Sequence, residues 1–92
     1  MTQDHLSALY AAAEAKKGEE GWMILPDGRS MTLYVAAEGA TLTVSRVQSL
    51  RLEGQLVHAK TSKGEHYIVA LEDAYAGSVD APNSIAKKAG FV

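Results

Sequence analysis

The chain has 92 residues, a net charge of −2 and no cysteine. This composition excludes disulfides and thiolate metal sites, and it gives no general attraction to nucleic acid or to an anionic membrane. No apolar run approaches the ~20 residues that span a bilayer, and no basic region precedes a hydrophobic block as in a secretory signal. We therefore expect a cytoplasmic protein that has one small domain, residues 1–79, and no membrane contact.

Residues 3–17 are predicted to form an N-terminal amphipathic helix. The apolar positions follow the i, i+3, i+4, i+7 spacing of such a helix: Leu6, Leu9, Tyr10 and Ala13. Thr2 or Asp4 can cap its start, and Gly18 is predicted to end it. The apolar stripe is narrow, so the helix is expected to dock on its own sheet or on a partner.

From residue 22 onward, the pattern changes to short strands separated by turn signals. The expected strands are 22–25, 31–37, 41–45, 47–53, 56–61 and 65–71. No helix-length segment separates them, which predicts an antiparallel meander of five or six strands that curls into a small barrel or roll. The fold class is therefore α+β or mainly β. Residues 72–77 are predicted to form a short helical turn, and residues 80–92 a flexible C-terminal tail.

The last hairpin of this meander has a register that can be derived from its residues. A three-residue loop, 62–64, pairs Ala59 with Tyr67 and keeps the apolar side chains on one face. A two-residue loop, 63–64, would shift the pairing by one residue and expose them to water. The longer loop needs a left-handed residue at Gly64, which glycine adopts without a steric cost. The opposite face then carries three polar side chains: His58, Lys60 and His66.

The segment before this hairpin breaks strict alternation. Val47 and Leu50 are three residues apart, although both are apolar and belong on the buried face. A β-bulge near Gln48-Ser49 would return both side chains to that face. It would also bend the sheet, as closure into a barrel requires.

No group of residues predicts catalysis. The carboxylates lie in expected turns and at helix ends, and the serines lack a nucleophile elbow or an oxyanion motif. There is no phosphate-binding glycine motif, and His58 and His66 do not have an HxH or HExxH spacing. We therefore expect a protein that is not an enzyme and that binds no cofactor or metal.

The favoured interpretation is a small binding or regulatory module that acts through protein contacts, with another protein or as a homo-oligomer. An open meander leaves edge strands, and edge strands pair readily with other chains. The helix, with its narrow apolar stripe, is a second candidate docking element. A small-molecule binder or enzyme that uses the mouth of the barrel is a third hypothesis.

A nucleic-acid-binding β module is the main alternative, because small β barrels bind strands with aromatic and basic side chains on one face. Segment 31–79 also resembles the β-roll of LytTR-type DNA-binding domains in its short strands, its T-x-x-G hairpin turn and the leucine-containing turn that follows. Bacterial pleckstrin-like folds share this pattern. Acidic residues outnumber basic ones by 11 to 9, which favours protein contacts. The candidate surface residues for either partner are Trp22, Tyr34, Arg46, Arg51, His58, Lys60 and His66.

Overall fold

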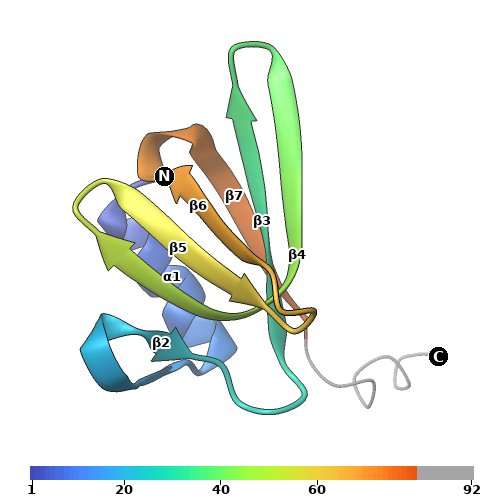
Figure 1. Cartoon of the computed structure of the whole chain (residues 1–92). Coiled ribbons are helices and arrows are strands. Elements are labelled where there is room, and N and C mark those ends of the chain that lie inside the picture. The colour runs from blue at the N-terminus through green and yellow to red at the C-terminus, as the bar shows by residue number, and fades with distance from the viewer. Residues whose placement is uncertain (81–92) are drawn as a thin grey trace, which may run out of the picture.

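An N-terminal helix and a curled antiparallel sheet make up the computed structural model, which describes residues 1–80 (Figure 1). Helix α1 spans Gln3–Ala13, and two short 3-10 helices, η1 and η2, span Glu19–Gly21 and Leu71–Asp73. The strands are β1 (Lys16–Lys17), β2 (Met23–Ile24), β3 (Ser30–Ala37), β4 (Ala40–Glu53), β5 (Leu56–Thr61), β6 (His66–Ala70) and β7 (Ala74–Asp80). The expected fold class is confirmed: the chain is mainly β, with an N-terminal helix and a sheet curled into a half-barrel.

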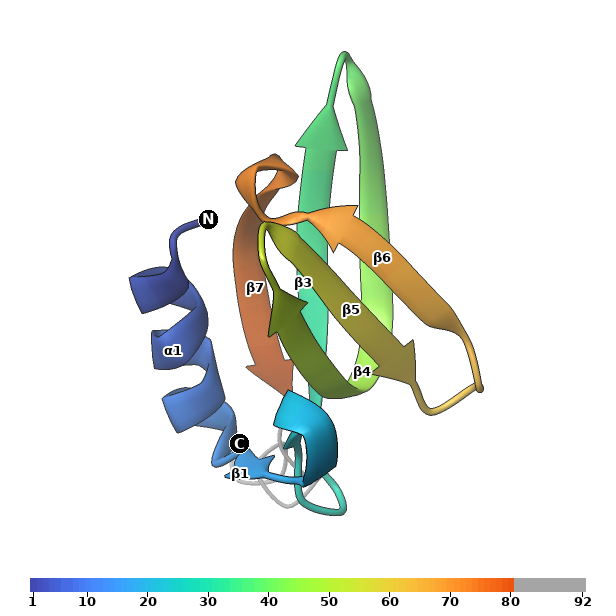
Figure 2. The ribbon, with the colours of Figure 1, turned by 60° about the vertical axis from the view of Figure 1, so that its left-hand side comes forward.

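The long strand β4 organises the sheet. Its N-terminal half pairs with β3, and its C-terminal half pairs with β5 on one side and with β2 on the other. Strand β7 extends the sheet beyond β3, β6 extends it beyond β5, and β1 extends it beyond β2. All of these pairs are antiparallel. The sheet therefore curls around β4 and leaves β6 and β7 as separate edges (Figure 2).

Two bulges in β4 account for this curl. Against β3, the register shifts between Val44 and Val47, and Arg46 has a left-handed φ of 60°. Against β5, Val47 pairs with Thr61 but Ser49 pairs with Lys60, so one extra β4 residue lies between the two pairs. The bulge expected near Gln48-Ser49 is confirmed, and the bulge at Arg46 is an addition to it.

The bulges also decide which side chains enter the core. Val44, Val47 and Leu50 are three residues apart, and each is at most 1% exposed. Strict alternation would place Val47 on the face opposite to Val44 and Leu50, whereas one extra residue in each interval returns all three to the same face. The core lies between this face and α1, and its largest fully buried side chains are Leu6, Met31, Leu33, Leu50, Val44, Val47 and Val57.

The predicted register of the β5–β6 hairpin is confirmed. Ala59 pairs with Tyr67, and Gly64 has a φ of +87° in the three-residue loop. The Gly64 N–H donates to the Thr61 carbonyl oxygen at 3.0 Å, which closes this turn. Ala59 is fully buried, while Tyr67 is half-buried at the edge of the core.

Helix α1 is shorter than the predicted helix 3–17, and this expectation is wrong at its C-terminal end. The helix ends at Ala13 because Glu14 adopts a left-handed conformation with a φ of 58°. The Ala15 N–H then donates to the Tyr10 carbonyl oxygen at 3.0 Å. Lys16 and the residue after it leave the helix to pair with β2, so Gly18 lies in the β1–β2 connection instead of ending the helix.

The predicted helical turn over residues 72–77 is wrong beyond Asp73. Helix η2 ends there, and β7 begins at Ala74, which is fully buried. Strand β7 pairs with β3 along the whole of its length. Its backbone N–H and C=O groups are therefore satisfied by the neighbouring strand and not within a helical turn. Asp80 belongs to β7, and the rest of the predicted tail, 81–92, lies outside the described residues.

Helix α1 docks on β7, as Figure 2 shows. Thr2 caps the helix by accepting a hydrogen bond from the His5 N–H at 3.0 Å. The N-terminal amine of Met1 donates to the carbonyl oxygens of Leu71 and Ala74 at 3.1 and 2.6 Å. Burial raises the pKa of Tyr10 to about 12.

Among residues 1–80, no helix has both the length and the hydropathy of a membrane span.

Candidate functional site

The outer face of the sheet, opposite the core, carries two neighbouring rows of side chains. Residues directly opposite each other in an antiparallel pair lie on the same face, so the strand register defines each row. The first row crosses five strands and consists of Lys16, Ile24, Ser49, Lys60 and His66. The second row consists of Arg51, His58 and Ile68. These two rows, together with Trp22, are called the Trp22 face below.

Trp22 lies over this face instead of in the core. It follows η1 directly and comes one residue before the Met23–Leu50 pair, which places it beside the second row. Its ring centroid lies 5.9 Å from that of His66 and 6.4 Å from that of His58, both in edge-on geometry. The Lys60 Nζ lies 4.4 Å from the indole centroid, which is a cation–π contact. The only tryptophan of the chain is therefore held by polar neighbours on the outside of the sheet.

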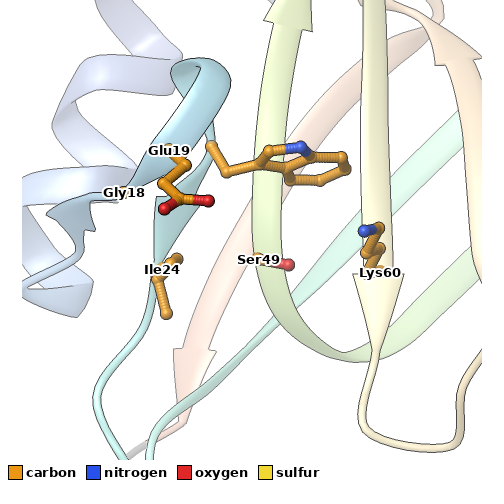
Figure 3. A pocket seen from close by; sticks show the side chains of 6 residues that line it. Gly18, Glu19, Ile24, Ser49 and Lys60 are labelled. Carbon is orange, nitrogen blue, oxygen red and sulfur yellow. The ribbon is translucent and has the colours of Figure 1, made fainter.

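An open pocket of about 380 Å³ lies beside the indole. Its lining residues are Gly18, Glu19, Trp22, Ile24, Ser49 and Lys60. Figure 3 shows Glu19 and Ile24 on one side of this space and Lys60 on the opposite side, with Ser49 between them. Trp22 and Ile24 supply apolar walls, and Ile24 is 47% exposed. The pocket therefore combines an apolar surface with one acidic and one basic group.

Gly18 lies where the turn around η1 approaches Ile24 in the wall of the pocket. Its N–H donates to the Trp22 carbonyl oxygen at 2.7 Å, which ties the two ends of the η1 turn together. A Cβ at Gly18 would lie 2.5 Å from the Ile24 Cδ1 atom, closer than real Cβ contacts. A side chain at this position would therefore push the exposed Ile24 side chain aside and change the wall of the pocket.

Three side chains on the Trp22 face and its border form a chain of close polar contacts. The Nδ1 atom of His58 lies 3.1 Å from the Nε2 atom of His66. On the other side of the His58 ring, Nε2 lies 3.2 Å from Oε1 of Glu53. That nitrogen is buried and has no hydrogen-bond partner, so the Glu53 contact has the distance of an ion pair without hydrogen-bond geometry. Arg51 also approaches Glu53, at 3.7 Å, and this exposed ion pair adds little stability.

The structure brings together five of the seven residues predicted for a partner surface. Those on the Trp22 face are Trp22, Arg51, His58, Lys60 and His66. Tyr34 lies elsewhere, in β3, where its ring centroid is 6.4 Å from that of Tyr75 in β7. Arg46 is exposed at the bulge of β4. These two residues therefore do not join the same surface.

Sequence reasoning missed Ile24, Ile68 and Glu53 as parts of this site. Ile68 could have been found, because the predicted register already places it beside His58 and not with the buried residues. Ile24 lies in a two-residue strand, which is too short for an alternation signal. Glu53 is a possible neighbour of the two histidines from the sequence, but the hairpin register alone does not place its side chain beside them, because Glu53 belongs to β4. Comparison with protein-family models, curated proteins and solved structures finds no match to this chain. The functional conclusion therefore rests on this geometry.

Proposed function

We propose that the chain is a non-catalytic binding module that makes protein contacts through the Trp22 face. The observation that carries this proposal is the position of the only tryptophan, outside the core and beside an open apolar pocket. Tryptophan is enriched among the residues that dominate protein interfaces, where it fills or lines a pocket. Ile24 and Ile68, at 47% and 55% exposed, extend the apolar surface on either side. Exposed apolar surface of this kind is typical of interaction sites.

The partner that fits this face is a polypeptide segment with one large apolar side chain and an acidic neighbour. The apolar side chain matches the pocket between Trp22 and Ile24. The basic residues of the face, Lys16, Arg51 and Lys60, outnumber the acidic ones beside it, Glu19 and Glu53. Complementary charge speeds encounter and selects among partners. Another protein or a second copy of this chain can supply such a segment.

The free edge of β6 supports the same proposal. Strand β6 pairs only with β5 among the described residues, so its outer backbone groups have no strand partner. An extended segment can add to such an edge and gain main-chain hydrogen bonds, while its side chains reach neighbouring pockets. The cysteine-free composition fits contacts made in the cytoplasm, where thiols are kept reduced.

Replacing Trp22 with Ala tests this proposal. Random peptides are selected on the immobilised wild-type chain, and self-association is measured by sedimentation velocity. We expect Trp22→Ala to weaken the peptide affinity or the self-association at least about tenfold, as loss of a central interface residue does. Tyr75→Ala is the matched control, because Tyr75 is an aromatic residue that is 58% exposed on β7. Equal losses in both variants, or no association of either kind, would contradict the proposal.

Nucleic acid is the second candidate, since Trp22, Arg51 and Lys60 do lie on one face. Base stacking needs an open aromatic face. Here the indole is in contact with Lys60 and with two histidine rings, and Glu19 lines the pocket beside it. These contacts would have to rearrange before a base could stack on the indole. The observed arrangement therefore favours a polypeptide.

Fluorescence anisotropy with labelled single-stranded and duplex oligonucleotides across a salt series separates the two candidates. At physiological salt, we expect no binding tighter than the non-specific range of ~10⁻⁴–10⁻⁶ M. A chain that binds phosphates would instead show affinity that falls steeply with salt, because each neutralised phosphate releases counterions. Nanomolar binding with such a slope, lost in the Arg51→Ala and Lys60→Ala variants, would replace the protein-contact proposal with the nucleic-acid one.

A further inference from the structure

Two imidazole nitrogens from neighbouring strands meet at the edge of the Trp22 face. His58 in β5 pairs with Ile68, and Lys60 pairs with His66 in β6, so the two histidines are diagonal neighbours across the strand pair. The Nδ1 of His58 and the Nε2 of His66 form a hydrogen bond of 3.1 Å, in which one ring donates its N–H and the other accepts it. A divalent transition metal binds imidazole nitrogen at about 2.0–2.1 Å, so a shared ion at this separation would subtend about 100°. That angle lies between the octahedral and tetrahedral values, so an ion that displaces the proton shared by the two nitrogens would bind both of them without a large movement of the rings.

The other nitrogen of His58 supplies an independent observation. The His58 side chain is only 17% exposed, and its buried Nε2 has no hydrogen-bond partner while Oε1 of Glu53 lies 3.2 Å away. A neutral imidazole that binds a metal through Nδ1 carries its proton on Nε2. Metal-bound histidines usually donate that proton to a carboxylate, which fixes the ring and strengthens the ligand. Glu53 lies at the distance of this carboxylate without hydrogen-bond geometry, and its side chain, which is 59% exposed, would turn to accept that proton when the ion binds.

We propose that His58 Nδ1 and His66 Nε2 bind one divalent transition-metal ion that prefers imidazole ligands, such as Cu²⁺, Ni²⁺ or Zn²⁺. Glu53 acts as a positioning residue, because it touches His58 and not the ion. Imidazole selects these ions, whereas Mg²⁺ and Ca²⁺ prefer oxygen ligands. This site does not depend on the proposed protein contacts.

The rest of the coordination sphere is left to other donors. In residues 1–80, no group of three or more His, Cys, Asp or Glu residues could hold a metal ion. Two protein ligands therefore leave positions for water or for a residue of a docked partner, as in open metal sites. The nearby Lys60 ammonium opposes a cation, but it lies over the indole of Trp22, and the Glu53 carboxylate offsets its charge beside His58.

Trp22 provides the readout for the test. It is the only tryptophan, and its ring lies 5.9 Å from the ring of His66, so Cu²⁺ bound there quenches its fluorescence. The untagged full chain is titrated with Cu²⁺, and we expect saturable quenching at one ion per chain. Zn²⁺, which does not quench indole by itself, should reverse the quenching by competition, and Mg²⁺ should not.

Three variants locate the ion. We expect His66→Ala to raise the Cu²⁺ dissociation constant well over tenfold, because one of the two ligands is lost. Glu53→Gln should raise it about tenfold, as loss of a carboxylate behind a metal-bound histidine does. Without metal, the melting temperature of Glu53→Gln should stay close to that of the wild type. With Zn²⁺, the increase in melting temperature should be smaller in Glu53→Gln than in the wild type. A purely structural role of Glu53 would instead lower the melting temperature without metal. His5→Ala, an exposed histidine on α1, is the matched control and should bind as the wild type does. Quenching that does not saturate, or that is unchanged in His66→Ala, would overturn the site.

Discussion

Leu50→Ala is expected to lower the free energy of unfolding by about 2–5 kcal/mol, the range for removing a large buried aliphatic side chain. Leu50 is 0% exposed and lies where three strands meet, paired with Met23 of β2 and with Ala59 of β5. Neighbours fixed on both sides of β4 cannot collapse fully into the space that the side chain leaves, so a cavity adds to the lost burial. This loss is a large fraction of the total stability of a small domain. Urea denaturation of the full chain, followed by circular dichroism, measures the change.

Leu42→Ala is the matched control for this prediction. Leu42 lies in the same strand, but it is 40% exposed in the arm where β4 pairs with β3 alone. The same truncation should cost less than about 1 kcal/mol there, because much of the side chain is already in water. Equal effects of the two substitutions would mean that Leu50 does not lie in the core, and the inner face of the half-barrel would have to be assigned again.

The parts of the fold that the sequence predicts are those in which one local pattern is sufficient. The β5–β6 hairpin is such a case, because only one loop length keeps the apolar residues together and Gly64 fits that loop. The bulge near Gln48 is another, since the three-residue spacing of Val47 and Leu50 demands it. In both places, the constraint comes from residues that are close in sequence.

The wrong expectations concern segments whose structure depends on distant partners. The helix ends at Ala13 because the next residues must reach β2, and the cap is Glu14, a residue type that rarely adopts a left-handed conformation. Strand β7 contains Gly77 among small residues, and it has no clear apolar alternation. It is a strand because β3 offers it a complete edge, and no local signal in residues 74–80 reveals that edge.

The candidate site divides in the same way. The hairpin register alone predicts that His58, Lys60 and His66 share one face, and they lie there. Trp22 joins them only because β2 pairs with β4 through two residues, a contact too short to leave a sequence pattern. Arg46 was grouped with them by its charge, but its bulge position depends on pairing with β3. Side-chain chemistry therefore suggested the members of the surface, and long-range pairing selected among them.

Gly77→Val is expected to destabilise the chain by about 1–3 kcal/mol, the usual cost of forcing extra atoms into a packed interior. Gly77 lies in β7 under helix α1, and a Cβ there would lie 2.7 Å from the Leu9 Cδ1 atom and 3.4 Å from the Thr32 carbonyl oxygen. Valine is favoured over glycine in strands by at most ~1 kcal/mol. Overpacking outweighs this gain because Leu9 is only 9% exposed and has little room to move. Urea denaturation again gives the free energy.

A second substitution separates a clash with the helix from a general effect on the strand. Leu9→Ala alone removes buried surface and should destabilise the wild type by about 2–5 kcal/mol. In the Gly77→Val background it should cost much less, because it also makes room for the new side chain, and a double-mutant cycle measures that coupling. Ala76→Val, one position earlier in β7, is the control and should change stability by less than about 1 kcal/mol. Additive effects of Leu9→Ala and Gly77→Val would show that α1 does not pack on Gly77. A coupling above about 1 kcal/mol would establish that the absence of a side chain at this glycine lets the helix dock on the sheet.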